Sequence, residues 1–159
     1  MNTSAQPLAR ISPAPIRRGI SNALLFGLAV TLLYLGLVTP PEPFLARIPV
    51  LLLGGFTLWL ANQGYKSREV GIDLWPDAVR DSNGRLLAEI DQIGSVDRGA
   101  FAFKPSNGFV LHLKRAAPLG WTPGLFWRVG TRIGVGGTTN PSETRNMADQ
   151  IGFLLSEHP

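Results

Sequence analysis

The sequence predicts an α+β protein: a two-helix transmembrane hairpin followed by a small antiparallel β-barrel or sandwich, capped by a C-terminal helix. Two long, uncharged apolar runs early in the chain predict the hairpin. Alternating apolar and polar residues between regular turn signals predict the β domain. An apolar stripe at helical spacing near the end predicts the capping helix. We expect three parts: an N-terminal cytoplasmic tail at 1–18, the hairpin at 19–64 and the β domain at 65–159.

Composition narrows the class of protein. Of the 159 residues, 45% are hydrophobic and 16% are charged, against roughly 25% charged in an average soluble domain. A disordered tail would need few apolar residues and many charges, so that class is excluded. The chain has no Cys and two His, which excludes disulfides, thiol chemistry and cysteine metal sites. We find no catalytic motif, metal-ligand set or cofactor loop, and expect a protein that is not an enzyme and binds no cofactor.

The first expected membrane helix covers residues 19–38. The chain carries no charged residue from Gly19 to Pro41, and a bilayer core of ~30 Å needs about 20 apolar residues in a helix. A cleaved signal peptide has a short basic start and an apolar stretch of about 7–15 residues. Here 18 mostly polar residues come first and Pro40-Pro41 follow the run. We therefore expect a retained helix.

The second expected membrane helix covers residues 46–64, around the uncharged run from Ile48 to Tyr65. Three prolines in the connecting segment 39–47 forbid helix continuation and predict a stiff turn. The alternative is a pair of buried helices in a soluble protein. The rest of the chain is too small to cover two helices that are apolar all round, so we expect membrane lipids to surround the hairpin.

Small residues recur on both helices at the spacing that lets membrane helices approach closely. In the first helix these are Ala23, Gly27 and Thr31, and in the second they are Thr57 and Ala61. They are the expected contact positions within the hairpin. Gly and Ala are also common in membrane helices that do not pair, so the alternative is that these positions make no contact.

Basic residues near the membrane ends predict the orientation, because cytoplasmic loops carry an excess of Lys and Arg. The loop between the two helices has Arg47 alone, with Glu42 near it. The outer ends of the hairpin carry more positive charge. We therefore expect a bacterial inner-membrane protein with both termini in the cytoplasm. The flanking basic residues are Arg10, Arg17, Arg18, Lys66 and Arg68.

The β domain is predicted to contain about seven antiparallel strands. Apolar residues alternate with polar ones along several short segments, and Asn83-Gly84 is a strong hairpin-turn signal because both residues tolerate positive φ. The segment 116–124, rich in Pro and Gly, is expected to be a loop. The expected strands lie at 70–75, on either side of the Asn83-Gly84 turn within 78–90, and at 93–104 (one or two strands), 109–114, 126–129 and 131–135.

A C-terminal helix is predicted over 141–157. Asn140 is a favourable N-cap, Pro141 suits the first helical position, and Glu143 places an acid in the first turn. An apolar stripe follows on one face. Its members are Met147, Ile151, Leu154 and Leu155.

About seven strands followed by one amphipathic helix resemble the pleckstrin-homology-like (PH-like) fold. A transmembrane helix pair beside such a domain looks like the bacterial PH-related membrane proteins. The resemblance covers roughly residues 66–158, with Asn140 to Leu155 as the capping helix. It implies that the helix plugs one end of a bent barrel and that function lies at the other end, the strand edges or the loops. Members that bind inositol phosphates use a basic cluster around the first hairpin; here Arg80 to Arg85 holds two arginines with an acid between them, a departure from that pattern.

Other candidate chemistry is thin. The glycines of Gly134–Gly137 precede a helix, but the Gly-Lys-Ser/Thr ending of a phosphate-binding P-loop is missing, so a strand end and turn is the better interpretation. Arg128 and Arg132 could belong to a basic patch. The β domain nevertheless holds 11 basic and 10 acidic residues, whereas nucleic-acid binders show a clear basic excess. We expect no nucleic-acid partner.

Two functions remain. The first is a membrane-anchored, non-catalytic binding module that acts through protein–protein contacts of its β domain; the second is an accessory or assembly subunit of an integral membrane complex. The partner would be another membrane protein or a second copy of the chain. The expected docking region contains Trp121, Leu125, Phe126 and Trp127, because Trp is enriched at binding hot spots. The alternative for these side chains, Phe126 and Trp127 above all, is that they fill the core of the domain.

Overall fold

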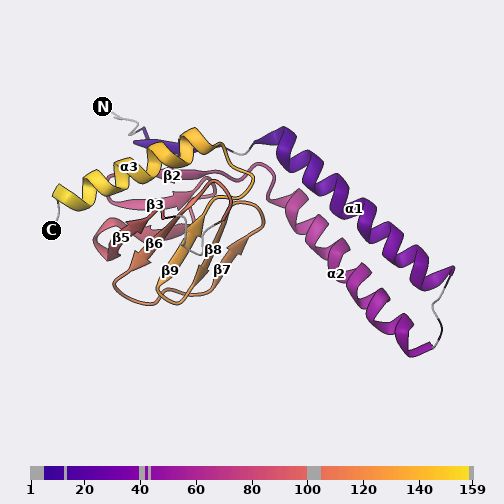
Figure 1. Cartoon of the computed structure of the whole chain (residues 1–159). Coiled ribbons are helices and arrows are strands. Elements are labelled where there is room, and N and C mark those ends of the chain that lie inside the picture. The colour runs from indigo at the N-terminus through magenta and orange to yellow at the C-terminus, as the bar shows by residue number, and fades with distance from the viewer. Residues whose placement is uncertain (1–5, 13, 40–41, 43, 100–104, 158–159) are drawn as a thin grey trace. The chain divides into compact units, whose positions relative to one another are not determined.

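A computed structural model of the chain describes residues 6–12, 14–39, 42, 44–99 and 105–157. Within them lie two apolar helices, two antiparallel β-sheets and a C-terminal helix (Figure 1). The α+β class is as predicted, but the two sheets are not closed into a barrel. The chain divides into two compact units. We call residues 15–68 the hairpin unit, and residues 1–14 with 69–159 the β unit.

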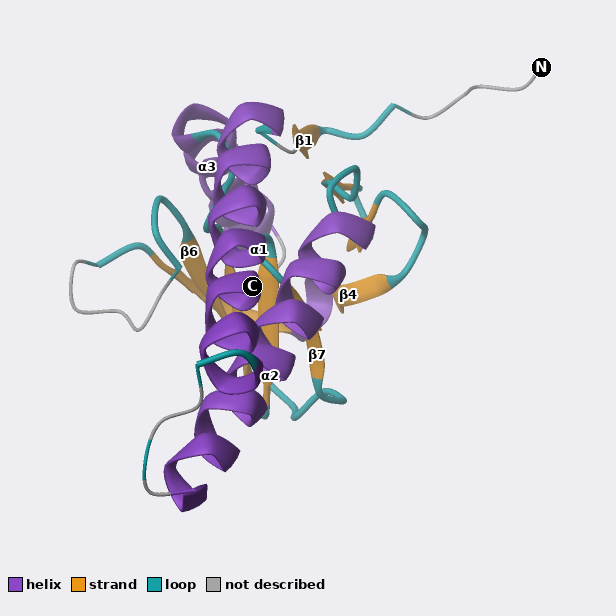
Figure 2. Ribbon diagram, turned by 90° about the vertical axis from the view of Figure 1, so that its right-hand side faces the viewer, coloured by secondary structure: helices purple, strands orange, loops and turns teal. Residues whose placement is uncertain are grey.

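The hairpin unit consists of two long helices that lie side by side (Figures 1 and 2). They are α1 (Pro15–Leu37) and α2 (Arg47–Lys66), and the short helix η1 (Phe44–Ala46) leads into α2. Two apolar spans of 23 residues each, α1 and Phe44–Lys66, are long enough to cross a membrane, since 23 residues rise about 34 Å. Most of their apolar side chains are exposed. The expected turn prolines at 40, 41 and 43 lie outside the described residues.

Small buried residues make the contact between α1 and α2. Ala29 and Gly36 are buried on α1. On α2 the buried positions include Gly54, where a side-chain carbon would lie 3.0 Å from Leu33 Cδ2 of α1. A carbon added at Gly36 would meet Leu51 Cδ2 at 2.5 Å. The helix backbones therefore approach closely at these two glycines.

The expected contact positions are only partly those that the structure uses. Thr57 and Ala61 are buried on α2. Ala23, Gly27 and Thr31 are exposed on α1, so the expectation that they pack against α2 is wrong. The Thr31 hydroxyl donates instead to the Gly27 carbonyl oxygen of its own helix, at 2.9 Å. The small buried residues of α1 are instead Ala29 and Gly36, which lie on a different face of the helix.

Arg18 joins the two outer ends of the hairpin. Its side chain is buried, whereas the sequence identified it only as one of the basic residues that flank the hairpin. Nη1 donates to the carbonyl oxygens of Ser67 at 2.7 Å and Arg68 at 3.0 Å. These carbonyls follow the last turn of α2, where backbone acceptors lack helical partners. Arg18 thus caps α2 from α1.

The first sheet of the β unit has the strand order β1-β2-β3-β4, with every neighbouring pair antiparallel. Its first strand comes from the segment that was expected to be a cytoplasmic tail. Ile11 pairs with Ile72 and Ala9 with Leu74, and all four are buried. Residues 9–11 therefore belong to the folded β unit. The strands are β1 (Ala9–Ile11), β2 (Ile72–Leu74), β3 (Ala78–Asp81) and β4 (Leu86–Glu89).

The second sheet has the order β5-β6-β9-β8-β7, also antiparallel throughout. A short helix, η2 (Ile90–Gln92), leads from the first sheet into it. The segment expected to be a loop contributes a strand, β7. The end of the expected strand at 93–104 falls partly on residues 100–104, outside the described residues. The strands are β5 (Ile93–Asp97), β6 (Phe109–Leu113), β7 (Gly120–Thr122), β8 (Phe126–Val129) and β9 (Arg132–Val135).

The C-terminal helix α3 (Pro141–Glu157) has the predicted bounds and lies along the β unit beside β1 (Figures 1 and 2). Asn140 Oδ1 accepts a hydrogen bond from the Ser142 amide at 3.2 Å, as the N-cap signal predicts. Met147 and Ile151 are completely buried in the core between the sheets and the helix. Leu154 and Leu155 are partly buried against that core. The helix thus covers an apolar face that the two sheets leave open.

Candidate functional site

The structure divides the expected docking residues between the core and the surface. Leu125 and Phe126 are 1% and 2% exposed and belong to the core. Trp121 is 47% exposed, and Trp127 is half-buried. Side chains alternate between the two faces of a strand, so Phe126 and Trp127 must face opposite ways. The core interpretation is correct for Phe126, and it fails for Trp127, whose side chain lies on the outer face of the sheet.

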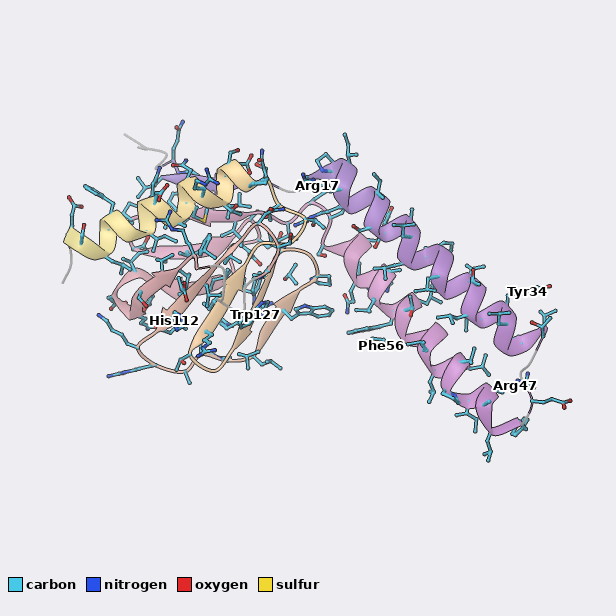
Figure 3. All side chains as sticks on the ribbon, in the orientation of Figure 1. Arg17, Tyr34, Arg47, Phe56, His112 and Trp127 are labelled. Carbon is cyan, nitrogen blue, oxygen red and sulfur yellow. The ribbon has the colours of Figure 1, made fainter. Side chains whose placement is uncertain are left out.

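Trp121 and Trp127 form a cross-strand pair on the outer face. They are direct partners in the register of β7 and β8, and directly opposed residues of an antiparallel pair share one face. Trp127 in turn lies opposite Gly134 of β9. A side-chain carbon at Gly134 would collide with the indole ring of Trp127. The ring therefore lies against the bare backbone of β9; Figure 3 labels Trp127 on β8. We call Trp121, Trp127 and Gly134 the tryptophan face.

Polar groups and one apolar residue border the tryptophan face. Val129, two residues after Trp127 and so on the same face, is 56% exposed. Arg132 lies opposite Val129 on β9 and is exposed. His112 of β6 lies opposite Arg132 and is half-buried. An exposed aromatic centre with charged residues at its rim is the arrangement of many protein-binding surfaces.

Arg128 lies on the inner side of β8, and it is not part of a surface patch. It is 7% exposed. Its Nε donates to the Pro118 carbonyl oxygen at 2.6 Å, and Nη1 donates to those of Leu86 at 3.1 Å and Leu87 at 2.9 Å. Burial, and after it the neighbouring Arg85, lower the pKa of the guanidinium from its ordinary value. Arginine nonetheless stays protonated in proteins, so Arg128 is a cationic clamp between the start of β4 and the segment before β7.

The described residues give little support for an acid–base catalytic site or a metal site. They contain no group of three or more His, Cys, Asp or Glu side chains that could hold a metal ion. Asp73 faces Arg10, with Oδ1 3.3 Å from Nε. Asp77 Oδ2 accepts a hydrogen bond from Arg80 Nη2 at 2.9 Å. These carboxylates therefore serve ion pairs, Asp73 across β1 and β2 and Asp77 at the turn between β2 and β3.

The glycines at the end of β9 do not cradle a phosphate. Gly136 and Gly137 have φ of 140° and 114°, which L side chains rarely adopt. Their amides are already used: that of Gly136 donates to the Leu125 oxygen and that of Gly137 to the Ser106 oxygen, both at 2.8 Å. A phosphate loop needs amides that point at the ligand. The predicted strand end and turn is therefore what these glycines form.

A cavity of about 330 Å³ lies beside the first half of α3. Thr144 lines it, and its hydroxyl donates to the Asn107 carbonyl oxygen at 2.7 Å. Arg98 lines it as well and forms an ion pair with Asp149 of α3. Both side chains are thus engaged within the protein, and we assign no ligand to this cavity.

No protein-family model, no curated protein and no solved structure matches the chain. Among the described residues, the tryptophan face is the exposed aromatic surface that a partner can contact.

Proposed function

We propose that this chain is a membrane-anchored, non-catalytic binding module, similar to the bacterial PH-related membrane proteins, whose β unit binds another protein through the tryptophan face. The observation that carries the proposal is the exposure of Trp121 beside Trp127 on the outer face of the sheet. The order of elements, two sheets followed by one C-terminal helix, supports the PH-like assignment. We propose no enzymatic activity, cofactor or nucleic-acid partner.

The chemistry of the tryptophan face favours a protein partner. Trp contributes a large apolar area with a polar N–H, and it is enriched among the residues that dominate binding energy. The β domain carries nearly balanced charge, with 11 basic and 10 acidic residues from Tyr65 onward. Contacts of this surface would therefore depend on apolar burial more than on net charge.

We place the protein in the bacterial inner membrane with both termini in the cytoplasm. The two ends of the hairpin lead into β1 and β2, which are neighbours in one sheet. Both ends of the hairpin must then be on the same side of the membrane. Arg17 and Lys66 lie near these ends, whereas Arg47 lies at the turn, with Tyr34 near it (Figure 3). The greater positive charge at the open end favours a cytoplasmic β unit.

A second candidate is an accessory or assembly subunit of an integral membrane complex. One observation favours it: Ala23, Gly27 and Thr31 form a stripe of small residues on α1 that is exposed and does not face α2. Such a stripe allows another membrane helix to approach closely. The main contact would then lie in the membrane, with another membrane protein or a second copy.

Substitution of single exposed residues in the full chain separates the two candidates. Trp121→Ala is compared with Phe153→Ala, a matched control because Phe153 is an exposed aromatic residue on α3. Each variant is cross-linked in cells and purified in mild detergent. We expect Trp121→Ala to reduce recovery of the bound protein several-fold and Phe153→Ala to leave it unchanged.

Loss of the partner with Gly27→Leu and full recovery with Trp121→Ala would favour the accessory subunit. Full recovery with both variants would contradict both candidates. Unchanged circular dichroism of each variant shows that the fold is retained.

A further inference from the structure

The β unit has short attachments to the hairpin, and both leave from one end of its first sheet. Ile11 ends β1 and lies opposite Ile72, which begins β2. Three residues separate Ile11 from Pro15 of α1, and five separate Lys66 of α2 from Ile72. At about 3.6 Å per extended residue, these links reach at most about 14 Å and about 22 Å. A helix of this length needs nearly all its residues to cross ~30 Å of hydrocarbon, so the shorter link keeps this end of the sheet within about 14 Å of the membrane end of α1.

The turn between β3 and β4 lies at the same end of the sheet. The Ser82 amide donates to the Gly71 carbonyl oxygen at 3.0 Å, and the Gly71 amide donates to Ser82 Oγ at 3.1 Å. Gly71 is the last residue of the link from α2. The turn is held rigidly, because Asp81 Oδ1 accepts hydrogen bonds from the amides of Asn83 and Arg85. All residues from 82 to 86 are exposed.

Exposed apolar side chains continue from this turn to the segment before β7. Leu86 is 43% exposed and Leu119 is 78% exposed. The Arg128 clamp brings their segments together, since it binds both the Leu86 and the Pro118 carbonyl oxygens. The Arg85 guanidinium lies against Gly120, where an added side-chain carbon would be 3.2 Å from Nη2. We call Arg85, Leu86 and Leu119 the leucine flank.

We propose that the leucine flank rests in the headgroup layer of the membrane that α1 and α2 cross. Two aliphatic side chains around an arginine suit that layer: the leucines reach the boundary of the acyl chains while the guanidinium meets phosphate. The covalent links limit how far the end of the first sheet that carries Leu86 can move from this surface. The contact goes beyond the proposed function, which concerns only the tryptophan face. It would hold that face beside the membrane, within reach of a partner that is itself a membrane protein.

The chain has no native Cys, so single cysteines can report the depth of each position. Leu86→Cys, Leu119→Cys and Ser95→Cys are made in the full chain. Ser95 is a matched control, because it is exposed and lies on β5, at the opposite edge of the second sheet from β7. Each variant is labelled with an environment-sensitive fluorophore and reconstituted in vesicles of phosphatidylcholine with a minor fraction of phosphatidylglycerol. Quenching is measured with aqueous iodide and with a lipid that carries a spin label just below the headgroup.

We expect labels at 86 and 119 to be quenched several-fold more by the spin-labelled lipid, and several-fold less by iodide, than the label at 95. Adding Leu119→Asp to Leu86→Cys should abolish the lipid quenching, because a carboxylate disfavours the acyl boundary. Iodide access at 119 equal to that at 95 overturns the proposal. Protection at 119 from both quenchers also overturns it, since that result indicates a protein on the flank. Neither result depends on Trp121, so the proposed function is tested separately.

Discussion

Arg128 shows how one side chain can join two sheets through backbone atoms alone. Its guanidinium binds three carbonyl oxygens, on the strand β4 side and on the segment before β7. A planar fork with several fixed donors can serve such divergent acceptors, and a lysine ammonium on a flexible stem cannot do so equally well. Next to Arg128 in the chain, Trp127 depends on Gly134, whose missing side chain leaves space for the indole ring. The surface pair of tryptophans thus depends on a rigid support beneath it.

Arg128→Lys is expected to lower the free energy of unfolding by about 2 kcal/mol, because at least one buried carbonyl loses its donor. The measurement is urea unfolding of the full chain in mild detergent, followed by tryptophan fluorescence. Arg132→Lys, on the exposed face of β9, is the control and should change the value by less than about 0.5 kcal/mol. Equal effects of the two variants would show that Arg128 is not a clamp.

The candidate site could be predicted from the sequence only in part. The exposure of Trp121 follows from its place between Gly120 and a Thr-Pro-Gly turn. The outward orientation of Trp127 depends on Gly134, which lies opposite it only because β8 and β9 pair in one register. The burial of Arg128 depends on carbonyls some 40 residues earlier in the chain. The residues that neighbour Trp127 and Arg128 in the sequence carry no information on such distant partners.

At the scale of elements, β1 is the feature that local pattern hides. Three residues, Ala9–Ile11, are too few to show an alternating pattern, and a proline lies close on each side of them, Pro7 and Pro13. The strand forms because it can pair with β2 and bury Ala9 and Ile11 against the core. In contrast, α3 was predictable to its ends, since the Asn140 cap and the apolar stripe are local signals.

Ile11→Ala should destabilise the β unit by about 2–4 kcal/mol, as expected for a large side chain removed from a core. Ile11 is 0% exposed, whereas Leu8, just before the strand, is 44% exposed. Leu8→Ala is therefore the control, with an expected loss under about 1 kcal/mol. Urea unfolding of the full chain provides both values. If Ile11→Ala proved as mild as Leu8→Ala, β1 would not be part of the stable sheet.

The two adjacent glycines of α2 provide a test of the hairpin contact. A side chain at Gly54 would press on Leu33 at 3.0 Å, while nothing lies within 4 Å of a carbon added at Gly55. Gly54→Val is expected to destabilise the pairing of α1 and α2 by about 2 kcal/mol, because overpacking forces the helices apart. Gly55→Val should have little effect. Thermal loss of helical circular dichroism in mild detergent compares the variants, and similar midpoints for both would place the helix contact elsewhere.

At the scale of the whole molecule, the pairing of β1 with β2 requires both ends of the hairpin to lie on the same side of the membrane. The charge pattern alone does not require this. The chain leaves the β unit after β1, passes through α1 and α2, and returns to the same unit at β2. If both helices cross the membrane, residues on either side of the hairpin must share one compartment. The positive-inside rule then only has to choose which compartment it is.

Single cysteines at Gln6, Glu42 and Ser106 test this relation in intact cells, since the native chain has none. Gln6 precedes β1, Glu42 lies between the helices, and Ser106 lies between β5 and β6; all three are exposed. A membrane-impermeant thiol reagent is expected to label position 42 in intact cells, and positions 6 and 106 only after the membrane is opened. Labelling of 6 and 106 but not 42 would reverse the orientation while keeping the hairpin. Different behaviour of 6 and 106 is incompatible with β1 and β2 in one sheet, because a folded β unit cannot lie on both sides of a membrane.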